Sequence, residues 1–136
     1  MEDFHAISSV SLDGLSLTLV DFIAVARGGA KVILTEKALR ALARSRALAE
    51  KIAAERRVAY GITTGFGDFA TVAVPEEMSS QLSTNLVLSH CTATGEPYAD
   101  EVVRGMMLLR ANALCVGMSG VRPALVEMLV EMLNRG

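Results

Sequence analysis

Apolar side chains recur along most of the chain at helical spacing, with short interruptions rich in glycine and proline, so the chain is predicted to be mainly α-helical. In the first half, threonines and glycines mark the ends of segments, as helix caps do. The elements predicted there are a possible short strand at 15–17, a helix after Thr18 that ends before Gly28, a strand at 31–34 (KVIL), and a long helix from Thr35 to about Arg57.

The second half shows helix starts of another kind, with proline or acidic residues in the first turn. The predicted helices run from Pro75 to about Cys91, from Asp100 (as a cap) to about Val116, and from Pro123 to residues 134–136. The chain has no repeats and no linker long enough to divide it. We therefore predict a single domain, or a fragment of one, over residues 1–136.

The long helix and the last helix each show a pattern that predicts their packing. The long helix is expected to bury Leu39, Leu42, Ala49, Ile52 and Ala53 and to present Lys37, Arg40, Arg44 and Lys51 to solvent. The last helix has a stripe of Leu125, Met128, Leu129, Met132 and Leu133, but Val126 and Val130 make its other faces apolar too. The helix before it is similarly apolar all round. Such helices belong inside a larger body, so we expect further chain or further subunits to cover them.

Charge and cysteine usage exclude several classes of protein. The formal net charge of −2 gives no reason to expect nucleic acid as a partner. Charged and polar residues interrupt the apolar stretch 102–118, which argues against a membrane span. Cys91 and Cys115 lack the spacing of metal ligands and lie in apolar helical patterns, so both are expected to be buried free thiols. The cysteine spacing therefore predicts no metal site. The start of the sequence shows no secretory signal, so the protein is expected to be cytoplasmic.

The segment 58–70 (VAYGITTGFGDFA) interrupts the helices with three glycines directly after Tyr60. Residues 65–70 fit the G-x-G-x-x-G/A pattern of dinucleotide-binding loops, but the helix and second strand that this motif requires do not follow. A simple turn between elements is the ordinary alternative. Glycines also allow a ligand to approach closely and let backbone N–H groups face a phenolate, which is what a tyrosine acting as general base requires.

The same segment resembles the Tyr-Gly-x-x-Thr-Gly-Phe-Gly signature of the aromatic amino acid ammonia-lyases. Three further blocks resemble the family's next segments in order: QLSTNLVLSHCTATGEP, VVRGMMLLRANAL and GMSGVRPALVEMLVEMLNRG. The N-terminal block DGLSLTLVDFIAVARGG is more loosely similar. The resemblance implies that the chain is the N-terminal part of a larger, all-α superhelical enzyme that assembles as a homotetramer.

The resemblance also implies roles for four residues. Tyr60 matches the catalytic acid/base tyrosine, and His90 matches the residue that contacts the imidazole of the substrate in histidine ammonia-lyases. Ser89 and Gly67 are implied to line the same pocket. By position alone, His90 at the end of a helix is more often a capping or core residue than a ligand contact. The following turn, 91–95 (CTATG), departs from the family's Ala-Ala-Gly-Val-Gly, which affects the placement of His90.

The family's electrophile, a methylidene-imidazolone, is formed from an internal Ala-Ser-Gly that is not encoded in this chain. The tripeptide Met118-Ser119-Gly120 matches a different, ordinary segment of the family. The expected activity is elimination of ammonia from L-histidine to give urocanate, with the chain inactive by itself. A phenylalanine or tyrosine ammonia-lyase, a tyrosine aminomutase, and a non-catalytic helical oligomerisation module are the alternatives.

Overall fold

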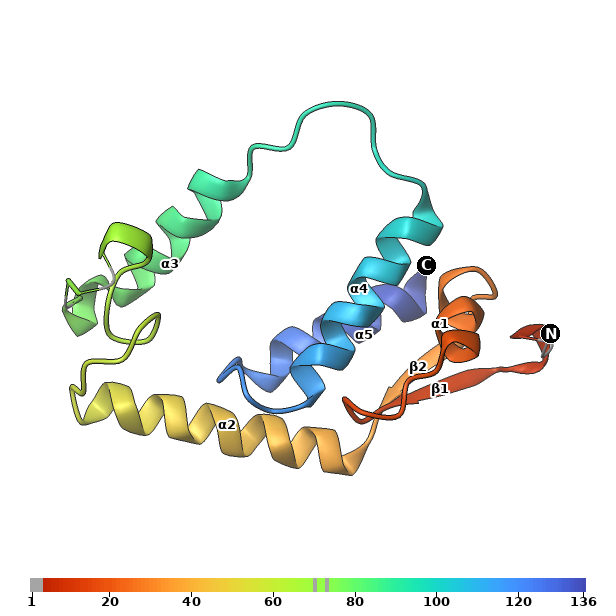
Figure 1. The fold of residues 1–136 in the computed structure, drawn as a ribbon, viewed down its shortest axis with the longest axis horizontal. Helices are drawn as coiled ribbons and strands as arrows, with labels where there is room; N and C mark the ends of the chain where they lie inside the picture. The colour runs from red at the N-terminus through yellow and green to blue at the C-terminus, as the bar shows by residue number, and fades with distance from the viewer. Residues whose placement is uncertain (1–3, 70, 73) are drawn as a thin grey trace. The chain divides into compact units, whose positions relative to one another are not determined.

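The computed structural model describes residues 4–69, 71–72 and 74–136, and the chain forms two compact units. The first unit comprises Met1–Ala47 and Pro97–Gly136, and the second unit comprises Leu48–Glu96. Five α-helices, two short strands and two 3-10 helices lie in the described part of the chain (Figure 1). The prediction of a mainly α-helical chain with a few short β pieces is confirmed.

The first unit begins with the 3-10 helix η1 (Phe4–Ala6) and a strand–helix–strand segment made of β1 (Ser9–Leu12), α1 (Leu19–Ala26) and β2 (Lys31–Leu34). The two strands are parallel, with Val10 opposite Val32. Their alternate side chains Val10, Leu12 and Val32 are buried, as the period of two along a strand requires. The KVIL strand was predicted, whereas the strand expected at 15–17 is wrong, because the pairing strand lies at Ser9–Leu12 and 15–17 connects it to α1.

The start of α1 confirms the predicted cap. The Thr18 hydroxyl accepts a hydrogen bond from the Asp21 N–H (3.2 Å), and the Asp21 carboxylate accepts one from the Thr18 N–H (3.0 Å). This reciprocal capping box satisfies two N–H groups that the helix itself leaves without partners.

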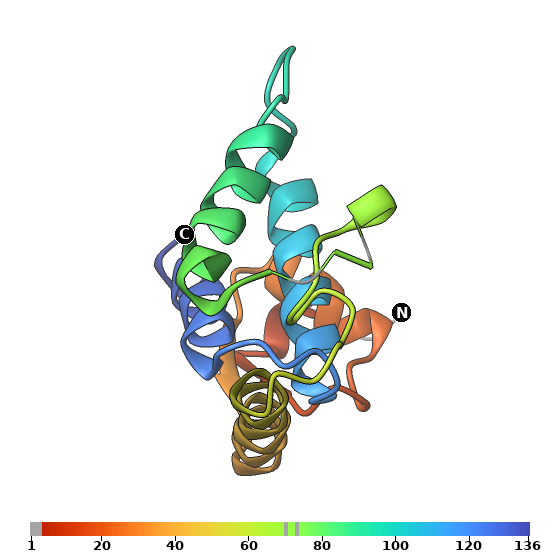
Figure 2. The ribbon, with the colours of Figure 1, turned by 90° about the vertical axis from the view of Figure 1, so that its left-hand side faces the viewer.

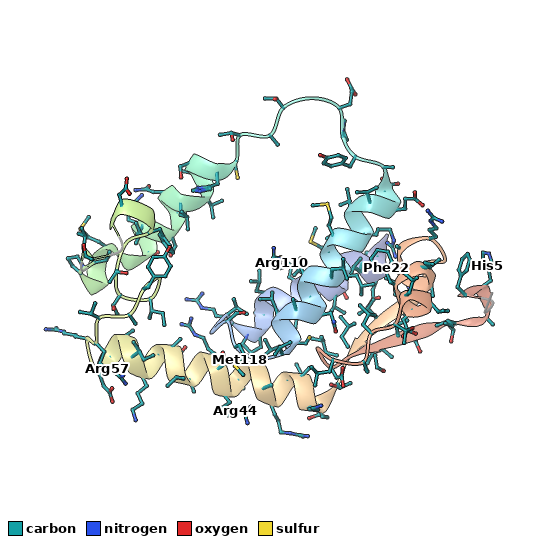
Figure 3. All side chains as sticks on the ribbon, viewed as in Figure 1. His5, Phe22, Arg44, Arg57, Arg110 and Met118 are labelled. Carbon is teal, nitrogen blue, oxygen red and sulfur yellow. The ribbon has the colours of Figure 1, made fainter. Side chains whose placement is uncertain are left out.

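Helices α4 (Asp100–Cys115) and α5 (Pro123–Arg135) pack against each other, α4 against α1 and α5 against β2 (Figures 1 and 2). Close packing is possible because Gly105 of α4 faces the ring of Phe22 of α1 (Figure 3); a Cβ at Gly105 would lie 2.7 Å from Cζ of that ring. The buried core of this unit is aliphatic: Val10, Leu12, Ala24, Val25, Val32, Ala38, Leu42, Leu108, Ala111, Leu114, Cys115, Val126, Val130 and Leu133.

Two side chains bind the backbone groups that the elements of this unit leave unsatisfied. The Arg104 guanidinium donates to the Val25 carbonyl of α1 (3.0 and 3.2 Å) and to the Leu133 carbonyl of α5 (3.1 Å), and cations are favoured at such helix C-termini. The Asn134 side-chain amide accepts from the Val32 N–H (2.7 Å) and donates to the Val32 carbonyl (2.9 Å). It thus occupies the free edge of β2 as a third strand would.

The buried face of α5 differs from the predicted one. Val126, Val130 and Leu133 are buried, whereas Leu125, Met128 and Met132 are exposed. The small, branched valines let α5 lie close to β2 and α4, and the longer side chains of the predicted stripe lie mostly on the other side. The sequence pattern could not discriminate between the faces because both are apolar.

Helix α2 (Glu36–Ala54) belongs to the first unit up to Ala47 and to the second unit from Leu48. The Thr35 hydroxyl accepts from the Ala38 N–H (3.1 Å), so the predicted cap is confirmed. The helix ends three residues earlier than expected, where Arg56 adopts a φ of +51°, a conformation common at helix C-termini. Of the face predicted to be buried, Leu42 and Ala49 are buried but Ala53 is exposed.

The second unit continues with a turn-rich segment, the 3-10 helix η2 (Gly67–Phe69) and α3 (Glu76–His90). Helix α3 begins at Glu76, one residue later than predicted, with Pro75 as its cap.

In the first unit, Asp100 is the first residue of α4 rather than its cap, which is Ala99.

Candidate functional site

Tyr60 lies in a tight turn shortly after the end of α2. The Ala59 carbonyl accepts hydrogen bonds from the N–H groups of Ile62 (3.1 Å) and Thr63 (3.0 Å), so residues 59–63 form one hydrogen-bonded turn. Tyr60 is 66% exposed. The turn therefore presents the phenol at the surface of its unit, where a ligand can reach it.

Phe66 packs against Tyr60 from the far side of the turn. The two rings meet edge to face, with centroids 6.2 Å apart and an interplanar angle of 77°, a favoured arrangement for aromatic pairs. Gly61 lies next to this pair with a φ of +71°, and a Cβ there would lie 3.3 Å from Cε1 of Phe66. Both the backbone conformation and the nearby ring therefore favour glycine at this position.

Two threonine hydroxyls bind the backbone on either side of Tyr60. The Thr63 hydroxyl accepts from the Ala59 N–H (2.9 Å) and donates to the Arg57 carbonyl. The Thr64 hydroxyl accepts from the Gly61 N–H (3.3 Å), and Thr64 is only 2% exposed. Thr64 is the threonine of the Tyr-Gly-x-x-Thr-Gly-Phe-Gly signature, but sequence reasoning assigned no role to either threonine. The signal available was two adjacent hydroxyls within reach of a glycine-containing turn.

Gly67, predicted to line the pocket, begins η2 with a φ of +57°. No atom of the other residues that the structure describes lies within 4 Å of the position that a Cβ would occupy there. The conformation favours glycine, and the side of the chain on which a Cβ would stand is open.

His90 and Ser89 are the last two residues of α3. The Nδ1 atom of His90 lies 2.8 Å from the Leu86 carbonyl oxygen and 3.0 Å from the Ser89 hydroxyl, which itself donates to Leu86 O (3.0 Å). Because a carbonyl oxygen can only accept, the proton of a neutral His90 ring is assigned to Nδ1. The Nε2 atom then keeps its lone pair and can accept a hydrogen bond from a ligand.

All four predicted site residues belong to the second unit, and all four are exposed. Tyr60 contacts Phe66, and His90 bonds to Ser89 and Leu86. In the described part of the chain, no hydrogen bond or ring contact joins Tyr60 to His90. Cys91, directly after His90, is exposed, so the prediction that both cysteines are buried is wrong for this one. It follows the last turn of α3, in which residues 87–90 are all exposed.

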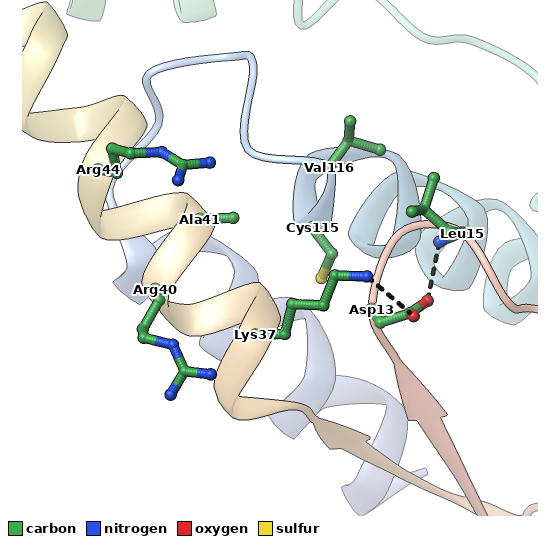
Figure 4. Close-up of a pocket in the computed structure, with 8 residues that line it drawn as sticks. All are labelled: Asp13, Leu15, Lys37, Arg40, Ala41, Arg44, Cys115 and Val116. Atoms are coloured by element: carbon green, nitrogen blue, oxygen red, sulfur yellow. Dashed lines mark hydrogen bonds and ion pairs between the residues drawn. The ribbon is translucent and has the colours of Figure 1, made fainter.

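A cavity of about 340 Å³ lies in the first unit, and none of the predicted site residues lines it (Figure 4). It lies between α2, the loop after β1 and the end of α4, and is lined by Asp13, Leu15, Lys37, Arg40, Ala41, Arg44, Cys115 and Val116. Burial, with a smaller contribution from the Asp13 charge, raises the pKa of the Cys115 thiol to about 11. This cysteine is therefore protonated at neutral pH and unsuited to act as a nucleophile.

Asp13 makes the folded chain sensitive to acid. Its carboxylate accepts hydrogen bonds from the N–H groups of Leu15 and Ser16 (both 2.8 Å) and from the Ser16 hydroxyl (2.9 Å), and these lower its pKa from 3.8 to about 2, with a small contribution from Lys37. A lowered pKa stabilises the fold above about pH 4, and this contribution is lost as the pH falls through about 2.

We therefore expect Asp13→Asn to reduce the free energy of unfolding more at pH 6 than at pH 2.5. Urea unfolding of both proteins across this range measures the difference. Lys37→Gln is the comparison: it removes only the 3.8 Å ion pair with Asp13, so most of the pH dependence should remain. An equal loss at both pH values for Asp13→Asn would contradict the expectation.

Two further properties of the described residues bear on function. None of their helices is both long and apolar enough to span a membrane. No group of three or more His, Cys, Asp or Glu side chains among them is arranged to hold a metal ion.

Comparison with known proteins agrees with the resemblance seen in the sequence. The family model for aromatic amino acid lyases matches residues 17–136. Histidine ammonia-lyase from Alkaliphilus metalliredigens is 47% identical over 127 residues, which are 93% of this chain and 25% of that protein. The chain thus spans about a quarter of the length of the curated relatives it matches.

Solved structures of two related enzymes share the fold. Tyrosine aminomutase from Streptomyces globisporus matches with a TM-score of 0.89 and 35% identity, over 94% of this chain and 24% of that one. Histidine ammonia-lyase from Trypanosoma cruzi matches with a TM-score of 0.83 and 36% identity, over the same shares of the two chains. With the family match covering most of its length, the chain belongs to the aromatic amino acid lyase family.

Proposed function

We propose that the protein carrying this chain eliminates ammonia from L-histidine to give urocanate. The proposal rests on the hydrogen bonding of His90. Its Nδ1 atom bonds to the Leu86 carbonyl of its own helix, so Nε2 is available as an acceptor. The imidazole N–H of a histidine substrate is a donor that this acceptor would recognise, whereas a phenyl ring offers none. The identity to histidine ammonia-lyases supports the same substrate.

Tyr60 is proposed as the base that takes the proton from the β-carbon of the substrate. It is exposed on a turn whose backbone is held by hydrogen bonds, so its oxygen can be kept at a set position while a substrate approaches. Gly67 and Ser89 are proposed to line the same pocket: Gly67 leaves space beside the chain, and Ser89 helps to hold the His90 ring.

The methylidene-imidazolone of the family is proposed for the full-length protein, where it would supply the electrophile that makes the amine a leaving group. These 136 residues contain no Ala-Ser-Gly, so the electrophile cannot be formed from them. We accordingly propose that the chain alone is inactive, and that the full-length enzyme is a cytoplasmic homotetramer. Urocanate formed by the purified 136-residue chain, followed by its ultraviolet absorbance, would refute the first of these statements.

The substrate proposal is tested by comparing kcat/KM of the full-length enzyme for L-histidine, L-tyrosine and L-phenylalanine. We expect L-histidine to be preferred and the product to be urocanate. The similarity to tyrosine aminomutase makes a β-amino acid product from L-tyrosine the main competing outcome. Preference for L-tyrosine or L-phenylalanine would refute the assigned role of His90.

A variant at His90 tests that role directly. His90→Leu should lower kcat/KM for L-histidine by about 10- to 100-fold, because a hydrogen bond to the substrate ring is lost, with a smaller change for L-tyrosine or L-phenylalanine. His5, the other histidine, is exposed in η1 of the first unit, so His5→Asn is the control and should leave activity unchanged. Full activity of His90→Leu toward L-histidine would contradict the role.

A further inference from the structure

We infer that Thr64 is a positioning residue for Tyr60, acting through its buried hydroxyl; the inference rests on the proposed function of Tyr60. The peptide group that follows Tyr60 has its N–H on Gly61, and this N–H donates to the Thr64 hydroxyl (3.3 Å). The peptide group that precedes Tyr60 is held mainly by backbone, since its carbonyl accepts from the N–H groups of Ile62 and Thr63, with a longer bond from the Thr63 hydroxyl (3.5 Å). Thr64 therefore supplies, in the described part of the chain, the side-chain hydrogen bond to the peptide group that follows Tyr60.

Thr64 is itself held on both sides by a second segment of chain. The Thr63 carbonyl accepts from the Val74 N–H (3.0 Å), and the Gly65 N–H donates to the Val72 carbonyl (3.1 Å). The Thr64 hydroxyl also donates to the Gly65 carbonyl (3.1 Å). These bonds and its 2% exposure leave the side chain little freedom, so it can act as a rigid support for the turn.

The Thr63 hydroxyl holds the chain before Tyr60, and the Thr64 hydroxyl holds the chain after it. The Thr63 hydroxyl bridges the Arg57 carbonyl and the Ala59 N–H before Tyr60. Without the Thr64 hydroxyl, the Gly61 N–H loses its partner and the glycine can rotate, because Gly adopts many backbone conformations. The phenol of Tyr60 would then move relative to the substrate proton, and a displacement of about 1 Å can lower a rate by about 100-fold.

Thr64→Val in the full-length enzyme tests the inference, since valine keeps the shape of threonine and removes the hydroxyl. We expect kcat for L-histidine to fall by about 10- to 100-fold with KM changed less than about threefold. Thr64→Ser, which keeps the hydroxyl, should restore kcat to within about threefold of the wild type. The control is Thr84→Val: this exposed hydroxyl on α3 donates to a carbonyl of its own helix (Ser80 O, 3.1 Å), and its loss should leave kcat unchanged.

A double variant separates positioning from a general structural role. If Thr64 acts through Tyr60, the Tyr60→Phe/Thr64→Val enzyme should be no slower than Tyr60→Phe alone. A further tenfold loss in the double variant, a wild-type kcat for Thr64→Val, or a change confined to KM would each overturn the inference. If Thr64→Val fails to fold, Thr64→Ser and Thr64→Ala replace it. The kcat of Thr64→Ser is then expected to be at least about tenfold higher than that of Thr64→Ala.

The proposed function can fail independently of this inference. A wild-type enzyme that does not release ammonia from L-histidine, or a fully active Tyr60→Phe variant, would refute the function itself. An inactive Tyr60→Phe together with a fully active Thr64→Val would refute the positioning role of Thr64 alone.

Discussion

Tyr60→Phe in the full-length enzyme should lower kcat for L-histidine by about 100- to 10,000-fold, the range typical of losing a general base. Phenylalanine keeps the ring and its edge-to-face contact with Phe66, so the turn should keep its structure while the proton acceptor is lost. Urocanate formation at saturating L-histidine measures kcat, and KM should change little because the phenol oxygen is not needed for binding in this role.

Tyr98→Phe is the matched control for this experiment. Tyr98 is the other tyrosine, is 73% exposed and belongs to the first unit, so the same chemical change there should leave the rate within about twofold of the wild type. A Tyr60→Phe enzyme with activity close to the wild type would exclude Tyr60 as the base.

Gly14→Ala should strongly destabilise the first unit. Gly14 has a φ of +87°, and a Cβ there would lie 2.7 Å from the Val116 backbone nitrogen. The backbone around Gly14 is also tied down, because its N–H donates to the Asn112 side chain (3.1 Å). The strained φ and the overlap together should cost about 2–5 kcal/mol in the free energy of unfolding.

Gly29→Ala separates the two causes of this loss. Gly29 has a similar φ of +69°, but nothing lies within 4 Å of its Cβ position. It should therefore lose only the backbone contribution, about 1–2 kcal/mol. Urea unfolding of both variants measures the difference, and equal losses would show that contact with the end of α4 does not matter.

The exposed apolar side chains of α4 and α5 fit a chain that spans a quarter of its relatives. Met106 and Leu109 of α4 and Met128 and Met132 of α5 are each more than half exposed. Exposed apolar surface of this kind marks a site of interaction with other protein.

The candidate site shows where prediction from the sequence stops. The motif around Tyr60 and the position of His90 were visible as residue patterns, and so was the need for glycine close to the tyrosine. The bonds that hold the turn were not visible in this way. The residues on either side of Thr64 form backbone hydrogen bonds with Val72 and Val74, and no periodic pattern in the sequence predicts this pairing. The same holds for the assignment of the His90 proton, which depends on the Leu86 carbonyl one helical turn away.

The local elements and the family could be read from residue patterns alone. Thr18, Thr35 and Pro123 mark helix starts, and KVIL forms a strand, because caps and strand preference depend on residues only a few positions apart. Tertiary structure decided which face of α5 is buried, that Cys91 is exposed while Cys115 is buried, and that β2 pairs with Ser9–Leu12. Each of these depends on contacts between segments far apart in sequence. Several apolar segments could pack against one another, and only the folded structure shows which of them do.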